Sequence, residues 1–169
     1  MNWYQLLIGA VAVERLAELV VTKRNRDWSR AHGGVEFGAG HYPVMVTLHV
    51  GLLAGCLIEP IVLHRPFVVA LGWPMLAIVV AAQALRWWCI ATLGHQWNAR
   101  VVVIPGAARV TGGPYRLLPH PNYLAVIAEG VALPLVHTAW VTALIFSVLN
   151  AVLLRTRIQV ENAALASLT

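Results

Sequence analysis

Apolar residues in this 169-residue chain gather into five runs, and two long polar connections at 22–41 and 92–121 interrupt them. A helix needs about 20 apolar residues, at 1.5 Å per residue, to cross the hydrocarbon core of a bilayer. The pattern therefore predicts an all-α integral membrane helical bundle of about five transmembrane segments, at 3–21, 42–63, 67–91, 122–136 and 138–155.

The five runs differ in how well they meet the length of a crossing. The second and third runs meet it, whereas the first does so only if Glu14, Arg15 and Glu18 are accommodated. The last two runs are short and are separated by His137. We expect them to form a helical hairpin whose turn lies near one interface, and which need not cross the membrane completely.

Composition supports a membrane protein. The chain is 59% hydrophobic and 11% charged, whereas soluble domains carry about 25% charged residues. This excludes an ordinary cytosolic globule, a disordered tail and a nucleic-acid-binding module. Cys56 and Cys89 lie inside apolar runs and predict no disulfide framework, and no Cys/His cluster has zinc spacing, so no metal site is expected. We expect one domain over 1–169, with three spans in 1–91 and a loop, hairpin and terminal helix in 92–169.

The basic residues indicate an orientation. Cytoplasmic loops of membrane proteins carry an excess of Lys and Arg. One side of the predicted bundle has only Arg65, while the two long connections and the C-terminal end carry nine basic residues: Lys23, Arg24, Arg26, Arg30, Arg100, Arg109, Arg116, Arg155 and Arg157. We therefore expect both connections and the C-terminus in the cytoplasm, and we interpret the net charge of +5 as an orientation signal.

Charged residues inside apolar runs are candidates for structural or functional roles, because charge is costly in lipid. Glu14 and Glu18 share one helix face beside Arg15, which favours a structural ion pair, with Arg86 as a further candidate partner. Glu129 has no neighbour in sequence that could neutralise it. It is a candidate functional carboxylate, unless another helix supplies a partner and makes it structural.

The second long connection holds the densest group of polar and turn residues. Gly112-Gly113-Pro114 predicts a tight turn, and Pro121 suits the first position of a helix with His120 at its cap. The free N–H groups of such a helix start attract anions, although the same residues can simply end a loop. Arg157 and Glu161, four residues apart, indicate a solvated helix end unless that helix packs against the 92–121 connection.

Several of these residues together resemble a known family. The segment Gly113-Pro114-Tyr115-Arg116, then His120-Pro121-Asn122-Tyr123, then a hairpin and Arg157 with Glu161, is similar to the isoprenylcysteine carboxyl methyltransferase family of membrane enzymes that use S-adenosylmethionine. The resemblance covers about 93–165. Pro119 stands where the family usually has Arg, and Asn162 stands where it usually has a second Glu.

The N-terminal half extends the resemblance to the short bacterial branch of that family. It rests on Glu14-Arg15-Leu16-Ala17-Glu18, Lys23-Arg24-Asn25, Gly33-Gly34 with Glu36, and His41-Tyr42-Pro43. Proteins of that branch often accompany type III polyketide synthases and O-methylate alkylpyrones or alkylresorcinols. The departures at Pro119 and Asn162 leave the cofactor fold in place and do not favour a prenylcysteine substrate.

The resemblance implies roles for six residues. His120, Tyr123 and Glu161 would belong to the S-adenosylmethionine site with Tyr115 and Asn122 in support, and Arg157 would lie near the reacting centre. A resorcinol hydroxyl would need a base because its pKa is near the tyrosine value of about 10. Glu129 and His120 are the candidates for that catalytic role.

The predicted function is thus S-adenosylmethionine-dependent O-methylation of a lipophilic small-molecule acceptor at the cytoplasmic face of the inner membrane. Membrane lipid is the other expected partner, with no nucleic acid and no obligate protein partner. Methylation of a prenylcysteine-like or other lipid carboxylate is one alternative. A non-enzymatic membrane protein that assists assembly or binds haem is another, with candidate haem ligands in His49, His64, His120 and His137.

Overall fold

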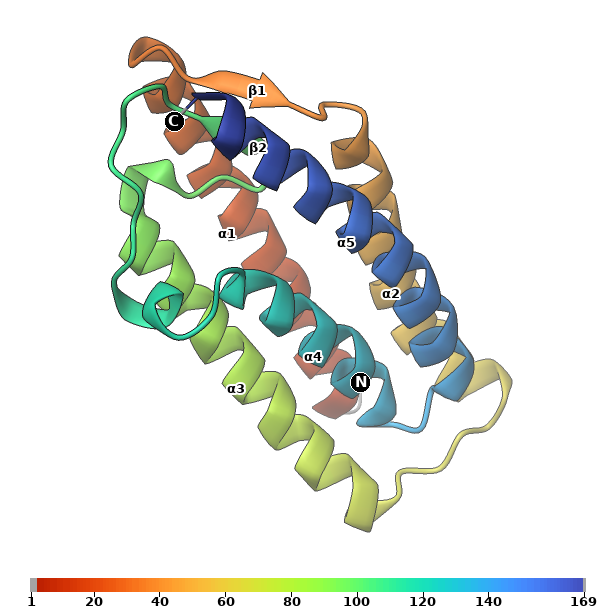
Figure 1. The fold of residues 1–169 in the computed structure, drawn as a ribbon. Helices are drawn as coiled ribbons and strands as arrows, with labels where there is room; N and C mark the ends of the chain where they lie inside the picture. Colours follow the sequence, from red (N-terminus) through yellow and green to blue (C-terminus); the bar gives the residue numbers. More distant parts are fainter. Residues whose placement is uncertain (1–2, 169) are drawn as a thin grey trace.

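The computed structural model describes residues 3–168 and shows an elongated bundle of helices (Figure 1). Within these residues the helices are α1 (Trp3–Ala31), α2 (His41–Val62), α3 (Val69–Leu93), α4 (Pro121–Leu135) and α5 (Trp140–Leu168). Two strands, β1 (Val35–Phe37) and β2 (Val101–Val103), and two short 3-10 turns, η1 (Gly94–Gln96) and η2 (Gly113–Arg116), complete the described chain. The predicted all-α membrane bundle is confirmed.

Membrane crossing is supported by length and composition for three of the helices in the described part of the chain, namely α2, α3 and α5. Helix α1 has 29 residues but carries charges in its middle. Helix α4 has 15 residues, which at 1.5 Å each span about 22 Å, less than the roughly 30 Å of the hydrocarbon core.

The predicted hairpin of the last two segments is present, with residues 136–139 joining α4 to α5. Thr138 in this turn has a positive φ of 54°, and its hydroxyl donates a 2.7 Å hydrogen bond to the carbonyl of Pro66. The second segment is longer than its apolar run. Helix α5 has 29 residues, because the polar stretch that holds Arg157 and Glu161 continues the helix, as the sequence indicated.

A buried carboxylate from another helix holds the start of α5. Glu59, in the last turn of α2, accepts hydrogen bonds from the backbone N–H groups of Val141 at 3.1 Å and Thr142 at 2.7 Å, and from the Thr142 hydroxyl at 2.8 Å. Arg65 Nε donates to the same carboxylate at 3.2 Å. An anion at a helix N-terminus satisfies free N–H groups and interacts favourably with the helix dipole.

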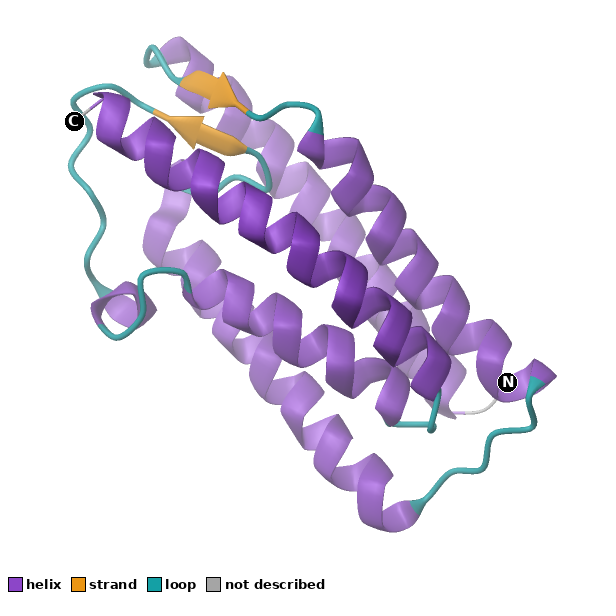
Figure 2. Cartoon of the chain, turned by 45° about the vertical axis from the view of Figure 1, so that its right-hand side comes forward, coloured by secondary structure: helices purple, strands orange, loops and turns teal. Residues whose placement is uncertain are grey.

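The two long connections meet in a small antiparallel sheet that the sequence did not predict. Val35 pairs with Val103 and Phe37 with Val101, and the pair of strands lies beside the C-terminal part of α5 (Figure 2). Both connections and the C-terminus therefore lie at one end of the bundle, with the N-terminus at the other (Figure 1).

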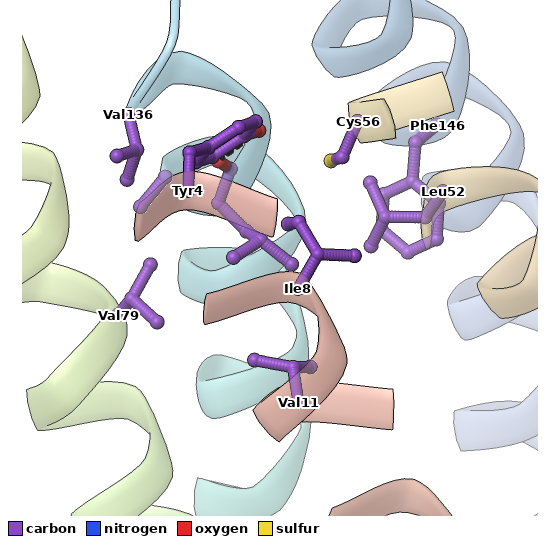
Figure 3. Packing of buried hydrophobic residues seen from close by; sticks show 10 residues of the cluster. Tyr4, Ile8, Val11, Leu52, Cys56, Val79, Val136 and Phe146 are labelled. Carbon is purple, nitrogen blue, oxygen red and sulfur yellow. Dashed lines mark hydrogen bonds between the residues drawn. The ribbon is translucent and has the colours of Figure 1, made fainter. Parts of the chain in front are cut away.

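The apolar core occupies the half of the bundle near the N-terminus. Its buried cluster draws on all five helices and includes Tyr4, Ile8, Leu52, Val79, Leu133 and Phe146 (Figure 3). Tyr4 donates from its hydroxyl to the carbonyl of Leu133 at 3.1 Å. Gly130 lets the Phe146 ring approach closely, since a Cβ there would stand 2.1 Å from a ring carbon. The other half of the bundle holds the cavity described next.

Candidate active site

A cavity of about 310 Å³ lies in the half of the bundle that contains the sheet. This volume is at the lower end of the roughly 300–1,000 Å³ typical of small-molecule sites. Side chains from α1, α2, α3, β2, α4 and α5 line it. Six of the seven residues that the sequence singled out are among them: Tyr115, His120, Asn122, Tyr123, Arg157 and Glu161.

A contact between α4 and α5 closes the polar end of this cavity. The Tyr123 hydroxyl donates to Glu161 Oε2 at 2.6 Å, and His120 Nδ1 lies 3.6 Å from Glu161 Oε1. The His120 and Tyr123 rings stack with centroids 5.4 Å apart. Pro121 begins α4 and places His120 at the cap position, so both rings emerge from the start of the helix and reach the same carboxylate.

Arg157 lies one turn before Glu161 on α5 and is only 6% exposed. Its Nη2 donates a hydrogen bond to the carbonyl of Ala99 at 2.8 Å. Arg157 and Glu161 thus each bind a partner outside their own helix. The polar end of α5 therefore packs against the 92–121 connection. In the sequence analysis, this packing was the condition for giving Arg157 and Glu161 a functional role.

Tyr115 and Asn122 complete the polar end. Gly113, with φ of 53°, turns the chain so that η2 lies against α3, where a Cβ would stand 2.5 Å from Thr92 Oγ1. Burial, followed by the neighbouring Cys89, raises the pKa of the Tyr115 phenol, so it is protonated and able to donate a hydrogen bond at neutral pH. Asn122 lines the cavity from the first turn of α4.

Several buried polar atoms around the cavity have no hydrogen-bond partner among the described residues. They include Asn98 Oδ1, Asn122 Oδ1 and Arg157 Nε, and all three side chains line the cavity. Because a buried polar group without a partner costs about 1–3 kcal/mol, this set fits a polar ligand that supplies the missing hydrogen bonds. A group with several donors and acceptors, such as S-adenosylmethionine, suits such residues.

Glu129 belongs to a buried ion-pair cluster with Arg15, Glu18 and Arg86. The other three residues line the cavity, and Glu129 does not. Arg86 contacts Glu129 at 2.5 Å and Glu18 at 3.4 Å, and Arg15 contacts Glu18 at 2.7 Å and also Glu129. Glu129 is 2% exposed. The partners come from α1 and α3, which satisfies the condition for a structural role, and a role as general base stays a prediction.

Glu14 does not take part in the contacts of this cluster. Its carboxylate accepts a hydrogen bond from Trp87 Nε1 at 2.7 Å. The structural ion pair that the sequence favoured is therefore present for Glu18, Arg15 and Arg86, with Glu129 as the fourth member in place of Glu14.

One wall of the cavity is apolar and continues onto the outer surface of the bundle. Leu16 and Leu19 of α1 and Met45, Val46 and Val50 of α2 line it. Leu16 and Val50 are both 62% exposed. A ligand in the cavity can therefore reach the apolar outer surface at Leu16 of α1 and Val50 of α2.

Polar residues that had no place in the predicted site also line the cavity, among them His49, Asn98 and Asn150. The histidines considered as haem ligands lie in separate surroundings. The His49 ring contacts Phe146, the His137 ring contacts Tyr4, and the His120 ring contacts Tyr123. A polar residue within an apolar run was the available signal for both His49 and Asn150, but it does not show which helix each one faces.

The fold is that of a helical membrane protein with a cavity at one end of the bundle. Residues 75–167, more than half of the chain, match the model of the isoprenylcysteine carboxyl methyltransferase family. The chain therefore belongs to this family of membrane methyltransferases. The match includes the whole of η2, α4 and nearly all of α5, and thus every residue of the predicted site.

Two relatives align over almost their full length. The uncharacterized protein YpbQ of Bacillus subtilis is 37% identical over 96% of this chain and 96% of its own length. An uncharacterized protein of Haemophilus influenzae is 24% identical over 99% of this chain and 98% of its own length. No solved structure matches the chain.

Proposed function

We propose that the protein catalyses S-adenosylmethionine-dependent O-methylation of a lipophilic acceptor, such as an alkylpyrone, an alkylresorcinol or a similar polyketide lipid. The observation that carries the proposal is that one cavity joins two opposite environments. Its polar end is closed by Tyr123, His120 and Glu161, and its apolar wall reaches the surface at Leu16 and Val50. A polar cofactor and a lipid acceptor can meet there.

The polar end would hold the cofactor. Glu161 is an anion suited to an ammonium group or to sugar hydroxyls, and His120 and Tyr123 keep its carboxylate in place. Asn98 and Asn122 offer carbonyl oxygens that need donors, and the protonated Tyr115 offers a donor. S-adenosylmethionine, when bound, supplies a methyl group on a sulfonium, whose sulfur keeps the electron pair when an oxygen takes the methyl.

The apolar wall would hold the alkyl tail of the acceptor. Leu16, Leu19 and Val50 present apolar surface both to the cavity and to the outside of the bundle, so a tail bound there would remain partly in lipid. The ring of the acceptor would then lie inside. In-line methyl transfer depends mainly on positioning the nucleophile and the methyl carbon, and a confined cavity supplies that positioning.

Arg157 and the buried ion-pair cluster would have different tasks. Arg157 has an unpartnered Nε beside the cavity and would orient an oxygen that carries negative charge. Glu129 is held by two guanidinium groups and by Gln83 Nε2 at 3.4 Å. We propose that Glu129 chiefly anchors α4 to α1 and α3 and keeps the cavity-lining side chains of Arg15 and Arg86 in position.

Methylation of a lipid carboxylate, including a prenylcysteine-like one, is the second candidate. The unpartnered Nε of the buried Arg157 favours it, because a guanidinium binds a carboxylate through two parallel hydrogen bonds. Such an acceptor is already ionised at neutral pH and needs no base.

The active end of the bundle would face the cytoplasm of a cell whose inner membrane holds the protein. Both long connections and the C-terminus lie at this end (Figure 1), and they carry nine of the twelve basic residues. Lys and Arg are enriched on the cytoplasmic side of membrane proteins, where S-adenosylmethionine is made available.

Calorimetric titration of the detergent-purified protein with S-adenosylhomocysteine tests the cofactor site. We expect binding by the wild type, at least a tenfold loss in Glu161→Gln, and no change in Glu14→Gln, whose carboxylate lies outside the cavity lining. Incubation with methyl-labelled S-adenosylmethionine and a lipid extract then identifies the acceptor. Folded wild type that gives no heat of binding would refute the enzyme and favour a non-enzymatic assembly or haem protein.

A further inference from the structure

His49 of α2 lies beside the cavity with one ring nitrogen engaged and the other available. Its Nδ1 lies 2.8 Å from the carbonyl of Met45, one turn earlier in the helix. A carbonyl only accepts hydrogen bonds, so Nδ1 carries the proton and Nε2 of the neutral ring carries a lone pair. Among the described residues the His49 side chain has one hydrogen bond, the one through Nδ1. The side chain lines the cavity, so Nε2 is available to a ligand there.

The surroundings of His49 place it at the apolar wall of the cavity, where the proposed acceptor would bind. We call this part of the cavity the acceptor end. Its ring meets Phe146 edge to face, with centroids 5.5 Å apart, and its neighbours Met45, Val46 and Val50 form the apolar wall. The charges of Arg15, Arg86 and Glu129 act on the ring, but these groups are paired with one another. None of them competes for Nε2.

Asn150 of α5 supplies a second acceptor atom on the same side. It follows Phe146 by four residues and therefore shares the helix face that meets His49. Asn150 is 3% exposed and lines the cavity. Its Oδ1 is buried without a partner among the described residues, so this end of the cavity presents two atoms that need donors.

The carboxylates in and beside the cavity are less suited to receive a proton. Glu18 and Glu129 form ion pairs with Arg15 and Arg86. Glu161, at the polar end, contacts Tyr123 and His120. A ligand that brings hydroxyl hydrogens to the acceptor end would therefore meet a histidine lone pair and an amide oxygen.

We propose that His49 is the general base for an acceptor that carries at least two hydroxyl or enol groups, with Asn150 as the residue that positions it. This rests on the proposed methyltransferase function. One hydroxyl gives its proton to His49 Nε2 as its oxygen takes the methyl group, and a second donates to Asn150 Oδ1. The bond from Nδ1 to the Met45 carbonyl steadies the imidazolium, which afterwards returns the proton to water.

The proposal selects among acceptor classes. A phenol with a pKa of about 10 is mostly protonated at neutral pH, and a well-placed base contributes roughly 10²–10⁴-fold to the rate. A lipid carboxylate would gain nothing from His49, because it arrives ionised and has no hydrogen for Asn150.

The test uses 5-pentylresorcinol as the hydroxyl probe, its dimethyl ether as the probe without hydroxyls, and palmitate as the carboxylate probe. The matched control is His32→Gln, since His32 Nδ1 makes the same 2.8 Å contact to a carbonyl one turn earlier, that of Trp28, but is exposed. At pH 7 we expect His49→Gln to lower kcat for the resorcinol about 10²-fold and His32→Gln to leave it unchanged. The defect should shrink toward pH 10, as the probe ionises by itself.

Binding without cofactor gives an independent readout. Calorimetry should show that the wild type prefers the resorcinol to its dimethyl ether by about tenfold, and that His49→Gln and Asn150→Leu reduce this preference. Because the preference is measured on the wild type, its absence would overturn the proposal even if neither variant folds.

The remaining outcomes separate the two proposals. If wild type and His49→Gln methylate the resorcinol equally, His49 is not the base, although the methyltransferase function stands. If the wild type methylates palmitate and not the resorcinol, the hydroxyl acceptor is refuted. If the wild type does not bind S-adenosylhomocysteine, the proposed function itself fails.

Discussion

Tyr123 donates a 2.6 Å hydrogen bond from its hydroxyl to Glu161 Oε2, across 38 residues of sequence. This bond joins the first turn of α4 to the C-terminal part of α5. It holds the Glu161 carboxylate at the polar end of the cavity, beside His120. The hairpin of α4 and α5 is thus fastened at both ends, by the turn at 136–139 and by this contact.

Removing the Tyr123 hydroxyl should weaken cofactor binding. Hydrogen bonds to charged groups contribute about 1.5–3 kcal/mol, so we expect Tyr123→Phe to bind S-adenosylhomocysteine about 10- to 100-fold more weakly. His120→Ala should lower the affinity as well. Isothermal titration calorimetry measures both changes. Tyr42→Phe is the control, because its ring would still stack under the Arg100 guanidinium. Unchanged affinity in Tyr123→Phe would separate this contact from cofactor binding.

Glu129→Gln should act mainly on stability. Removing its charge leaves Arg15 and Arg86 with one carboxylate, Glu18, for two cations, and breaking a buried pair costs about 3–5 kcal/mol. We expect a clearly lower Tm in detergent, while Glu14→Gln changes it little. The opposite pattern, an unchanged Tm with lost turnover and intact cofactor affinity, would favour Glu129 as the general base.

Arg157→Lys should lower turnover more than it lowers cofactor affinity. Lysine keeps the charge but lacks the planar array of donors, so both the bond to Ala99 and the free Nε are lost. We expect kcat to fall at least tenfold. Arg155→Lys, two residues away and exposed, is the matched control. Equal loss in both variants would show that the effect concerns the helix end rather than the reacting centre.

Glu59→Gln should destabilise the bundle without altering the active site. It weakens the bonds to the N-terminus of α5 and removes the ion pair with Arg65. Loss of a helix cap costs about 0.5–2 kcal/mol, so we expect a lower Tm and unchanged affinity for S-adenosylhomocysteine. A thermal scan followed by titration of the same sample checks both. Thr142→Val, which loses one hydroxyl bond to Glu59, should show a smaller shift.

The local pattern of residues was sufficient to predict the helices and part of the candidate active site. The apolar runs predicted all five helices, because a long run of apolar residues has few ways to satisfy its backbone in lipid other than as a helix. The turn and cap residues around Gly113 and Pro121 predicted where α4 begins. Since His120, Asn122 and Tyr123 are neighbours in sequence, their common location followed from that helix start.

The sequence indicated one contact between distant segments, that of Arg86 with Glu18, but it did not show the others. The runs Val35–Phe37 and Val101–Val103 are too short to show a strand pattern, and only their pairing makes them strands. Glu129 looked unpaired because its partners lie on α1 and α3. Glu59 gave no sign of its role at the start of α5.

The sequence by itself determined that this protein is a helical membrane bundle with a hairpin near its C-terminus, since burial in lipid acts on each segment separately. Only the tertiary structure decided which charges neutralise one another and which polar atoms stay unpaired beside the cavity. A charge in an apolar run must find a partner, but several helices can supply it. Packing of the helices placed Arg15 and Arg86 beside Glu129. It also left Asn150 Oδ1 without a partner among the described residues and engaged His49 through Nδ1, so that Nε2 is available to a ligand.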